Sequence, residues 1–90
     1  MTATSRPLIL EACVETIQQG LLAEKKHADR IEFCQRLDLG GVTPDHDLIR
    51  TVINKIKIPV KIMIRPRGGD FIYSNSEIDR MKSDIKYCKL

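Results

Sequence analysis

A segment with the pattern of a β-strand followed by a segment with the pattern of a helix occurs three times along this chain, and this alternation constrains its fold most. Strands are expected at about 8–13, 29–34 and 60–65, where short apolar runs show or approach a two-residue alternation. Helices are expected at about 15–27, 44–57 and 75–89, where apolar residues recur three and four positions apart. Strands that alternate with helices predict right-handed βαβ crossovers and a parallel sheet, so 1–90 is interpreted as one α/β unit.

Two of the expected helices begin with residues that are typical of helix starts. Thr43 followed by Pro44 predicts such a start, with the hydroxyl as N-cap and proline at the first helical position. Ser74 and Glu77 have the spacing of a capping box, in which each side chain accepts a hydrogen bond from the backbone of the other residue. His27 and His46, isolated at helix ends, are interpreted as solvated or capping groups.

Each expected strand carries apolar side chains on one face and charged or sulfur-containing side chains on the other. Ile31 and Phe33, for example, oppose Glu32 and Cys34. A flat sheet with helices on both sides requires two apolar faces. In a barrel the helices cover only the outer face, and polar side chains near the carboxyl ends of the strands line a site. The sequence therefore predicts the first three βα units of a TIM (β/α)8 barrel, with parallel strands and helices on the outer face.

Composition and charge argue against several classes of function. The chain has 15 Lys and Arg against 12 Asp and Glu, and its basic residues are dispersed among few aromatic ones, so nucleic-acid binding is not expected. No apolar run approaches the roughly 18 residues of a membrane span, and the N-terminus lacks the pattern of an export signal. Three widely spaced cysteines are an odd number and do not indicate a disulfide framework, so a reducing, cytoplasmic setting is expected.

The cysteines are the first candidate site. Cys13 and Cys34 share the inward parity near the ends of adjacent expected strands, and Met63 shares that parity on the next strand. Thiolate and thioether ligands favour Cu(I) over harder cations. Because neighbouring strands lie about 4.8 Å apart, two such thiolates can converge on one metal ion. The alternative is structural, since free cysteine is often buried as a small apolar side chain, and Cys88 is interpreted in this way.

Charged side chains of the inward parity, together with the loop after the third strand, form a second candidate site. Charges that face a barrel interior must be paired or bind a ligand, because an unpaired buried charge is unstable. One interpretation is a structural network in which Glu11 and Glu32 neutralise Arg30 and Arg65. The other is a pocket in which arginines bind an anion, a carboxylate acts as acid or base, and the glycines of 66–70 admit backbone amides. Its catalytic candidates are Glu11, Glu32, Arg65 and Arg67.

Several motifs resemble those of the CutC family. They are Leu10–Val14 (LEACV), Ala28–Cys34 (ADRIEFC), Gly40–Gly41 with Thr43–Pro44, and above all Ile58–Phe71 (IPVKIMIRPRGGDF) with Tyr73–Ser74. The resemblance extends over about 8–88. The chain departs from the family pattern where Lys26–His27 replaces a common glycine pair, and where Leu39 replaces an acidic residue before the glycines.

The resemblance implies the N-terminal part of a cytoplasmic TIM barrel linked to copper homeostasis, with Cys13 and Cys34 as Cu(I) ligands. Met63 is a further candidate because of its strand parity. The leading hypothesis is therefore copper handling through binding of Cu(I). The alternative is a metal-independent TIM-barrel enzyme that acts on a small anionic metabolite, and whether the protein is an enzyme is left open. A third hypothesis is that the 90-residue product has no function of its own. Because an open three-stranded sheet leaves an edge strand unpaired, association between copies of the chain is expected.

Overall fold

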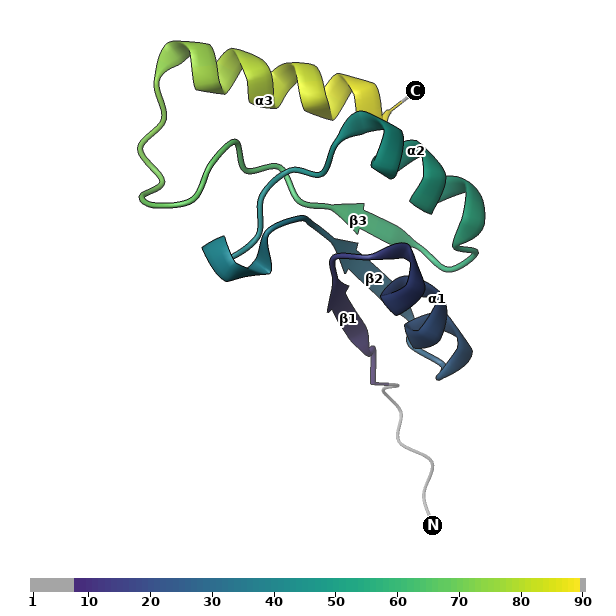
Figure 1. Ribbon diagram of the computed structural model, residues 1–90. Helices are drawn as coiled ribbons and strands as arrows, with labels where there is room; N and C mark the ends of the chain where they lie inside the picture. Colours follow the sequence, from purple (N-terminus) through teal and green to yellow (C-terminus); the bar gives the residue numbers. More distant parts are fainter. Residues whose placement is uncertain (1–7, 90) are drawn as a thin grey trace.

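Three parallel strands form one sheet in the order β1-β2-β3, and each strand leads into a helix (Figure 1). The structure is a computed structural model that describes residues 8–89. Its elements are β1 (Glu11–Val14), α1 (Ile17–Lys25), β2 (Arg30–Phe33), the short 3-10 helix η1 (Leu37–Leu39), α2 (His46–Lys55), β3 (Val60–Ile62) and α3 (Asn75–Cys88). Every expected strand and helix thus has a shorter counterpart, and β1 ends one residue later than expected, at Val14.

The core lies on one face of the sheet, beneath α1 and α2. Ile31 and Phe33 of β2 are completely buried there, packed with Val14, Val52 and Ile56. Burying a side chain of this kind stabilises a fold by about 1.5–3 kcal/mol. The opposite face carries the polar side chains of the three strands, Glu11, Cys13, Arg30, Glu32 and Lys61. This division confirms the strand parity and the outer position of the helices that the sequence predicts.

Thr43 and Arg65 explain why β3 and α2 are shorter than expected. The backbone N–H of Arg65 donates to the Thr43 hydroxyl (2.7 Å), and the Arg65 carbonyl accepts from the Thr43 N–H (2.9 Å), so the expected strand 60–65 ends at Ile62. The predicted helix start at Thr43 is wrong for the same reason, because its hydroxyl is bonded to Arg65. Helix α2 begins at His46 instead, after Asp45.

The other two helix starts are capped by side chains. Thr16 precedes α1 and its hydroxyl accepts from the N–H of Gln19 (3.0 Å). At α3, the N–H of Glu77 donates to the Ser74 hydroxyl (3.2 Å) and the N–H of Ser74 donates to the Glu77 carboxylate (2.8 Å). The predicted capping box is therefore confirmed.

Helix α3 is fastened to α2 by a polar and aromatic cluster rather than by the core. His46 Nε2 lies 2.8 Å from Oδ1 of the buried Asp84, and the His46 and Tyr87 rings stack with centroids 3.8 Å apart. The Tyr87 hydroxyl also donates to the His46 carbonyl (3.1 Å). The interpretation of His46 as a solvated or capping group is thus incomplete, because its partners lie about 40 residues further along the chain.

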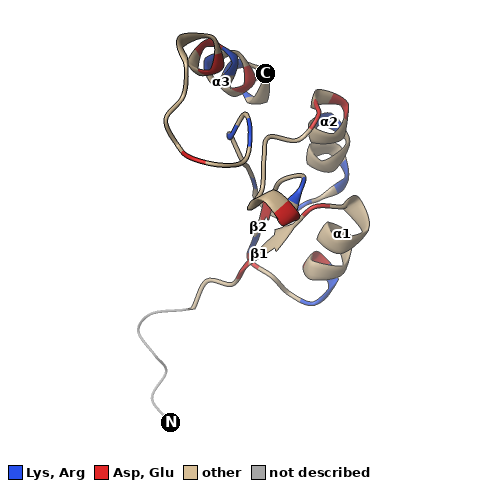
Figure 2. Ribbon diagram, turned by 60° about the vertical axis from the view of Figure 1, so that its left-hand side comes forward, with Lys and Arg blue, Asp and Glu red and all other residues tan. Residues whose placement is uncertain are grey.

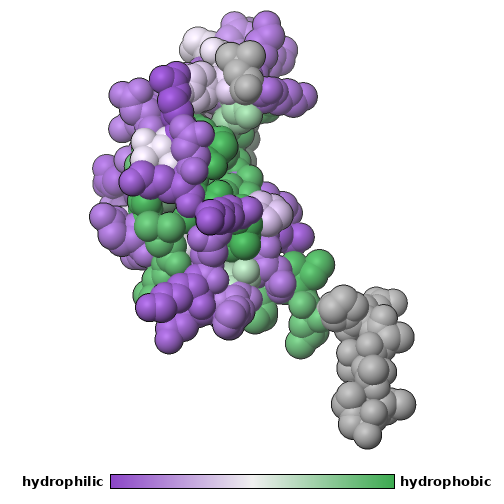
Figure 3. Space-filling model, turned by 90° about the vertical axis from the view of Figure 1, so that its right-hand side faces the viewer, coloured by the Kyte–Doolittle hydropathy of each residue, from purple (hydrophilic) through white to green (hydrophobic). Residues whose placement is uncertain are grey.

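An open apolar groove separates α3 from β3 and α2. Its lining comprises Ile53, Val60, Ile62, Ile64, Ile85 and Cys88. Apolar surface is also open to solvent at Leu8, Ile9 and Leu10, next to the grey residues in Figure 3. Among residues 8–89, the outer edges of β1 and β3 have no strand partner, and no helix is long and apolar enough to span a membrane. The expected association between copies remains a prediction.

Candidate metal-binding site

Cys13 and Cys34 meet at the carboxyl end of the polar sheet face. Cys13 belongs to β1, and Cys34 directly follows β2, where its backbone N–H donates to the Val14 carbonyl (3.1 Å). The two thiols lie close enough that each alters the pKa of the other. Cys13 is exposed, whereas 0% of Cys34 is exposed. The structure therefore brings the two predicted ligands together but presents only one of them to solvent.

Both thiols are held in their protonated form at neutral pH. Burial raises the pKa of Cys34 to about 11, and the nearby Cys13 and Glu15 contribute to the rise. Partial burial also raises the pKa of Cys13, to which the carboxylate of Glu32 adds, while Cys34 acts in the opposite direction. A metal ion that binds here must displace protons, because the thiolate is the ligand form.

Met63 lies beside the buried thiol. Its backbone N–H donates to the Phe33 carbonyl (3.0 Å), which places the residue just after β3. A β-carbon on Gly41 would lie 3.3 Å from Sγ of Cys34 and 3.4 Å from Cε of Met63, so both side chains border the Gly41 backbone. The prediction of Met63 as a further sulfur ligand is compatible with this position.

The donor set at this place is soft. Within residues 8–89, no three His, Cys, Asp or Glu side chains are grouped in a way that could hold a metal ion. The two thiols of Cys13 and Cys34, with the thioether of Met63, are ligands suited to Cu(I) rather than to a hard cation such as Mg²⁺. The residues present therefore fit a Cu(I) site and do not fit a carboxylate-bound metal.

Glu11 neutralises basic side chains of the two neighbouring strands. It forms an ion pair with Arg30 of β2, and its Oε1 lies 3.6 Å from Nζ of Lys61 on β3. The Arg30 guanidinium holds the pKa of Glu11 below its usual value. Charges of both signs are intermixed over the sheet and helices in Figure 2. The predicted structural network is therefore present at Glu11 and Arg30.

Glu32 and Arg65 do not join this network. Oε1 of Glu32 lies 3.8 Å from Sγ of Cys13, and no ion pair in the described part of the chain involves Glu32. The Arg65 guanidinium donates to the carbonyls of Leu39 (2.8 Å), Gly41 (3.1 Å) and Gly69 (3.0 Å), and it lies over the Phe71 ring. Arg65 is thus a cross-link between two loops.

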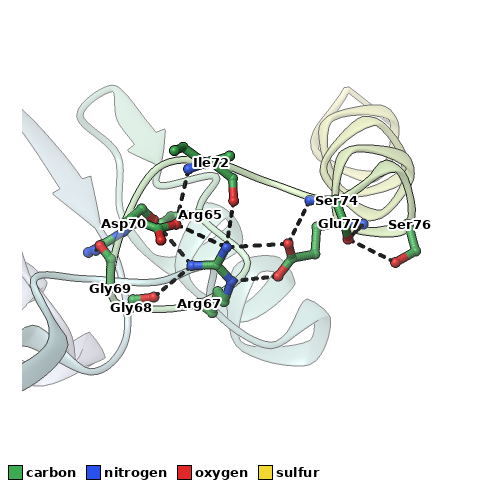
Figure 4. Close-up of polar contacts among 9 residues, drawn as sticks. All are labelled: Arg65, Arg67, Gly68, Gly69, Asp70, Ile72, Ser74, Ser76 and Glu77. Carbon is green, nitrogen blue, oxygen red and sulfur yellow. Dashed lines mark hydrogen bonds and ion pairs between the residues drawn. The ribbon is translucent and has the colours of Figure 1, made fainter.

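Arg67 organises the loop between β3 and α3, as Figure 4 shows. Its Nε donates to Oε2 of Glu77 (2.7 Å), and Nη2 donates to the Ile72 carbonyl (2.7 Å) and to Oδ1 of Asp70 (3.2 Å). Both Arg65 and Arg67 must give up such contacts before they bind an anion. The catalytic roles predicted for Glu11, Glu32, Arg65 and Arg67 remain predictions.

Comparison with known proteins then assigns the chain. A family model described as the CutC family matches residues 8–90. The chain belongs to the CutC family. It is 48% identical over 82 residues to a human protein named copper homeostasis protein cutC homolog, which covers 91% of this chain and 30% of that protein. It is 46% identical over 80 residues to a CutC family protein of Histophilus somni, which covers 89% of this chain and 33% of the relative.

The fold agrees with this assignment. The crystal structure of a protein described as a copper homeostasis protein CutC from Streptococcus agalactiae matches with a TM-score of 0.81 and 32% identity, over 92% of this chain and 41% of that chain. The predicted fold class, the first βα units of an α/β barrel, is confirmed. The chain spans about a third of the length of the CutC relatives it matches.

Sequence reasoning did not find the residues that surround the thiols. Gly40 and Gly41 signal a loop but not its contact with Cys34, and Thr43 was assigned to a helix start. The effect of the Glu15 carboxylate on the pKa of Cys34 has no sequence signal either, since no motif links these positions. What identifies them is the fold, which brings the loop after β2 back over the end of its own strand.

Proposed function

We propose that this CutC family chain takes part in cytoplasmic copper homeostasis by binding Cu(I) through Cys13 and Cys34, with Met63 as a third ligand. The observation that carries the proposal is the approach of two thiols and a thioether-bearing side chain at the carboxyl end of the sheet. The names of the human and bacterial relatives support copper as the cargo. Soft sulfur ligands retain Cu(I) against the hard cations that are abundant in cells.

The groups around the two thiols make Cu(I) binding dependent on pH. Glu11, Glu15 and Glu32 all raise the pKa of one or both thiols, and burial raises it further. Because both thiols are protonated at pH 7, each bound Cu(I) should release about two protons, and affinity should rise with pH. The negative charge of the same carboxylates also attracts a nearby cation. Binding is therefore an exchange, in which the thiols lose their protons and the metal ion takes their place among these carboxylates.

Cu(I) binding is tested by anaerobic competition with a chromogenic Cu(I) chelator. The 90-residue chain is compared with Cys13→Ser, Cys34→Ser and the double variant, with Cys88→Ser as the matched control. We expect the double variant to lose tight binding and the control to retain it, because Cys88 is the last residue of α3 and lines the apolar groove instead. Equal stoichiometry in the chain and the double variant would contradict the proposal.

A further inference from the structure

Cys34 is sealed although it lies at the end of the open, polar sheet face. Its neighbour Cys13 is exposed, but 0% of Cys34 is accessible. The cover is backbone, because a β-carbon on Gly41 would lie only 3.3 Å from Sγ of Cys34. On the other side, Sγ lies 3.8 Å from the Val14 carbonyl. A reagent or metal ion therefore cannot reach this thiol unless the chain around Gly41 moves.

The cover is one closed turn, which we call the Gln35–Val42 turn. Its ends are joined by two backbone hydrogen bonds, from Gln35 N–H to the Val42 carbonyl (3.0 Å) and from Val42 N–H to the Gln35 carbonyl (2.7 Å). Gly40 and Gly41 have φ of 87° and 93°, a conformation that other residues adopt only with strain. The turn has its own hydrogen bonds, and the Met63 side chain borders Gly41 beside the thiol.

Arg65 adds a polar anchor from the loop that follows β3. Its Nη1 donates to the carbonyls of Leu39 (2.8 Å) and Gly41 (3.1 Å), while its own backbone is bonded to Thr43. Nη1 is so close that a β-carbon on Gly40 would lie 2.8 Å from it. Arg65 is therefore hydrogen-bonded to the Gln35–Val42 turn at Leu39 and Gly41 and to Thr43 directly after it. The planar guanidinium can reach several carbonyls at once, whereas a lysine ammonium cannot hold this geometry.

We propose that Arg65 is a positioning residue that closes the Gln35–Val42 turn over Cys34, so that a soft metal ion is captured first by Cys13 and reaches Cys34 only when the turn loosens. The order of capture rests on the proposed Cu(I) function. The closure itself does not, since it concerns access to a thiol by any electrophile. Arg65 thus gates the second ligand, and an anion that drew its guanidinium away would open the site.

The test measures the accessibility of Cys34 without copper. In a Cys13→Ser/Cys88→Ser background, Cys34 is the single thiol, and its thiolate attacks the disulfide of Ellman's reagent to form a mixed disulfide and release thionitrobenzoate. We expect Arg65→Lys to raise this rate about 10-fold, as loss of charge-assisted hydrogen bonds implies. In the Cys34→Ser/Cys88→Ser background, the rate of Cys13 should not change with Arg65→Lys.

Two controls separate closure from general loosening. Arg67→Lys makes the same exchange two residues further along the same loop, where the hydrogen bonds of the side chain go to Gly68, Asp70, Ile72 and Glu77 and not to the Gln35–Val42 turn. Ile56→Val lowers core stability at a residue that packs on Gly20, away from the turn. Neither should raise the rate of Cys34 by more than about twofold, which is less than half a kcal/mol in free energy. A Cys34 rate that is equally raised by a control, or unchanged in Arg65→Lys, would overturn the proposal.

The outcome is distinguishable from failure of the Cu(I) proposal. If Arg65→Lys opens Cys34 but chelator competition shows no Cu(I) binding, closure stands and the metal assignment falls. If Cu(I) binds and Arg65→Lys leaves the rate of Cys34 unchanged, the metal assignment stands and the role of Arg65 falls. An unfolded chain would give equal rates for Cys13 and Cys34 in every variant, which also contradicts closure.

Discussion

Replacement of His27 by glycine is expected to stabilise this chain. His27 follows α1 with φ of 70°, in the left-handed region. Two hydrogen bonds require that conformation, from His27 N–H to the Glu24 carbonyl (3.0 Å) and from Ala28 N–H to the Ala23 carbonyl (3.0 Å). The chain therefore carries a β-carbon at a position whose backbone conformation favours glycine.

The size of the gain follows from two opposing terms. A residue with a β-carbon loses about 1–2 kcal/mol in the left-handed conformation. Glycine removes that loss but gives up about 0.5–1 kcal/mol of additional chain entropy on folding. The net gain is about 0.5–1 kcal/mol. Since 1 kcal/mol shifts the Tm of a small domain by about 4–8 °C, the Tm should rise by about 2–8 °C.

Thermal unfolding followed by circular dichroism measures this shift. His27 is exposed, so the substitution removes no packed side chain. His27→Ala is the matched control, because alanine keeps the β-carbon and should bring no rise in Tm. A Tm of His27→Gly at or below that of the unmodified chain, or an equal rise in His27→Ala, would refute the assignment of backbone strain to this position.

Four further predictions concern the loops, α3 and assembly. Gly41→Ala should lower the free energy of unfolding in urea by about 1 kcal/mol more than Gly69→Ala, because both have positive φ but only Gly41 meets a thiol at 3.3 Å. The backbone of Ser74 and the Arg67 guanidinium lower the pKa of Glu77, so its contribution to α3 is complete above pH 4.5 and is lost as pH falls through the lowered value. The helical ellipticity of the unmodified chain should therefore fall as the pH is lowered, and that of Glu77→Gln should not show this fall. His46→Ala should accelerate amide hydrogen exchange in α3 about 10-fold and leave α1 unchanged, as loss of one ring stack and one hydrogen bond to the buried Asp84 implies. Analytical ultracentrifugation of the chain should show association that increases with concentration, whereas a monomer at all concentrations would contradict the effect of unpaired edges.

The sequence indicates the elements and their faces because each depends on local patterns. The alternation at Ile31 and Phe33 predicts the buried face, and the spacing of Ser74 and Glu77 predicts the cap of α3. The prediction of a helix start at Thr43 rests on the same kind of local pattern and is wrong, because such a pattern does not account for a hydrogen-bond partner far away in sequence. The backbone N–H of Arg65, 22 residues further on, donates a hydrogen bond to the Thr43 hydroxyl.

At the candidate site too, local sequence patterns predict part of the arrangement, and contacts between residues far apart in sequence determine the rest. Strand parity places Cys13 and Cys34 on one face, and their proximity follows from the adjacent parallel strands. Burial of Cys34 does not follow from parity, since it depends on how the Gln35–Val42 turn folds back. The sequence places Arg65 either in a charge network with Glu11 and Glu32 or in a pocket for anions, because backbone carbonyl acceptors cannot be recognised in a sequence.

The ion pairs of Glu11 have a consequence for how the sheet avoids misalignment. Glu11, Arg30 and Lys61 belong to three different strands, and one carboxylate contacts both bases. If β2 slipped by one residue, Arg30 would turn toward the core and Ile31 toward the polar face, because successive side chains point to opposite faces. The apolar core and the charged trio would then fail together. The apolar core and the ion pairs of Glu11 thus disfavour the same wrong alignments of the three short strands.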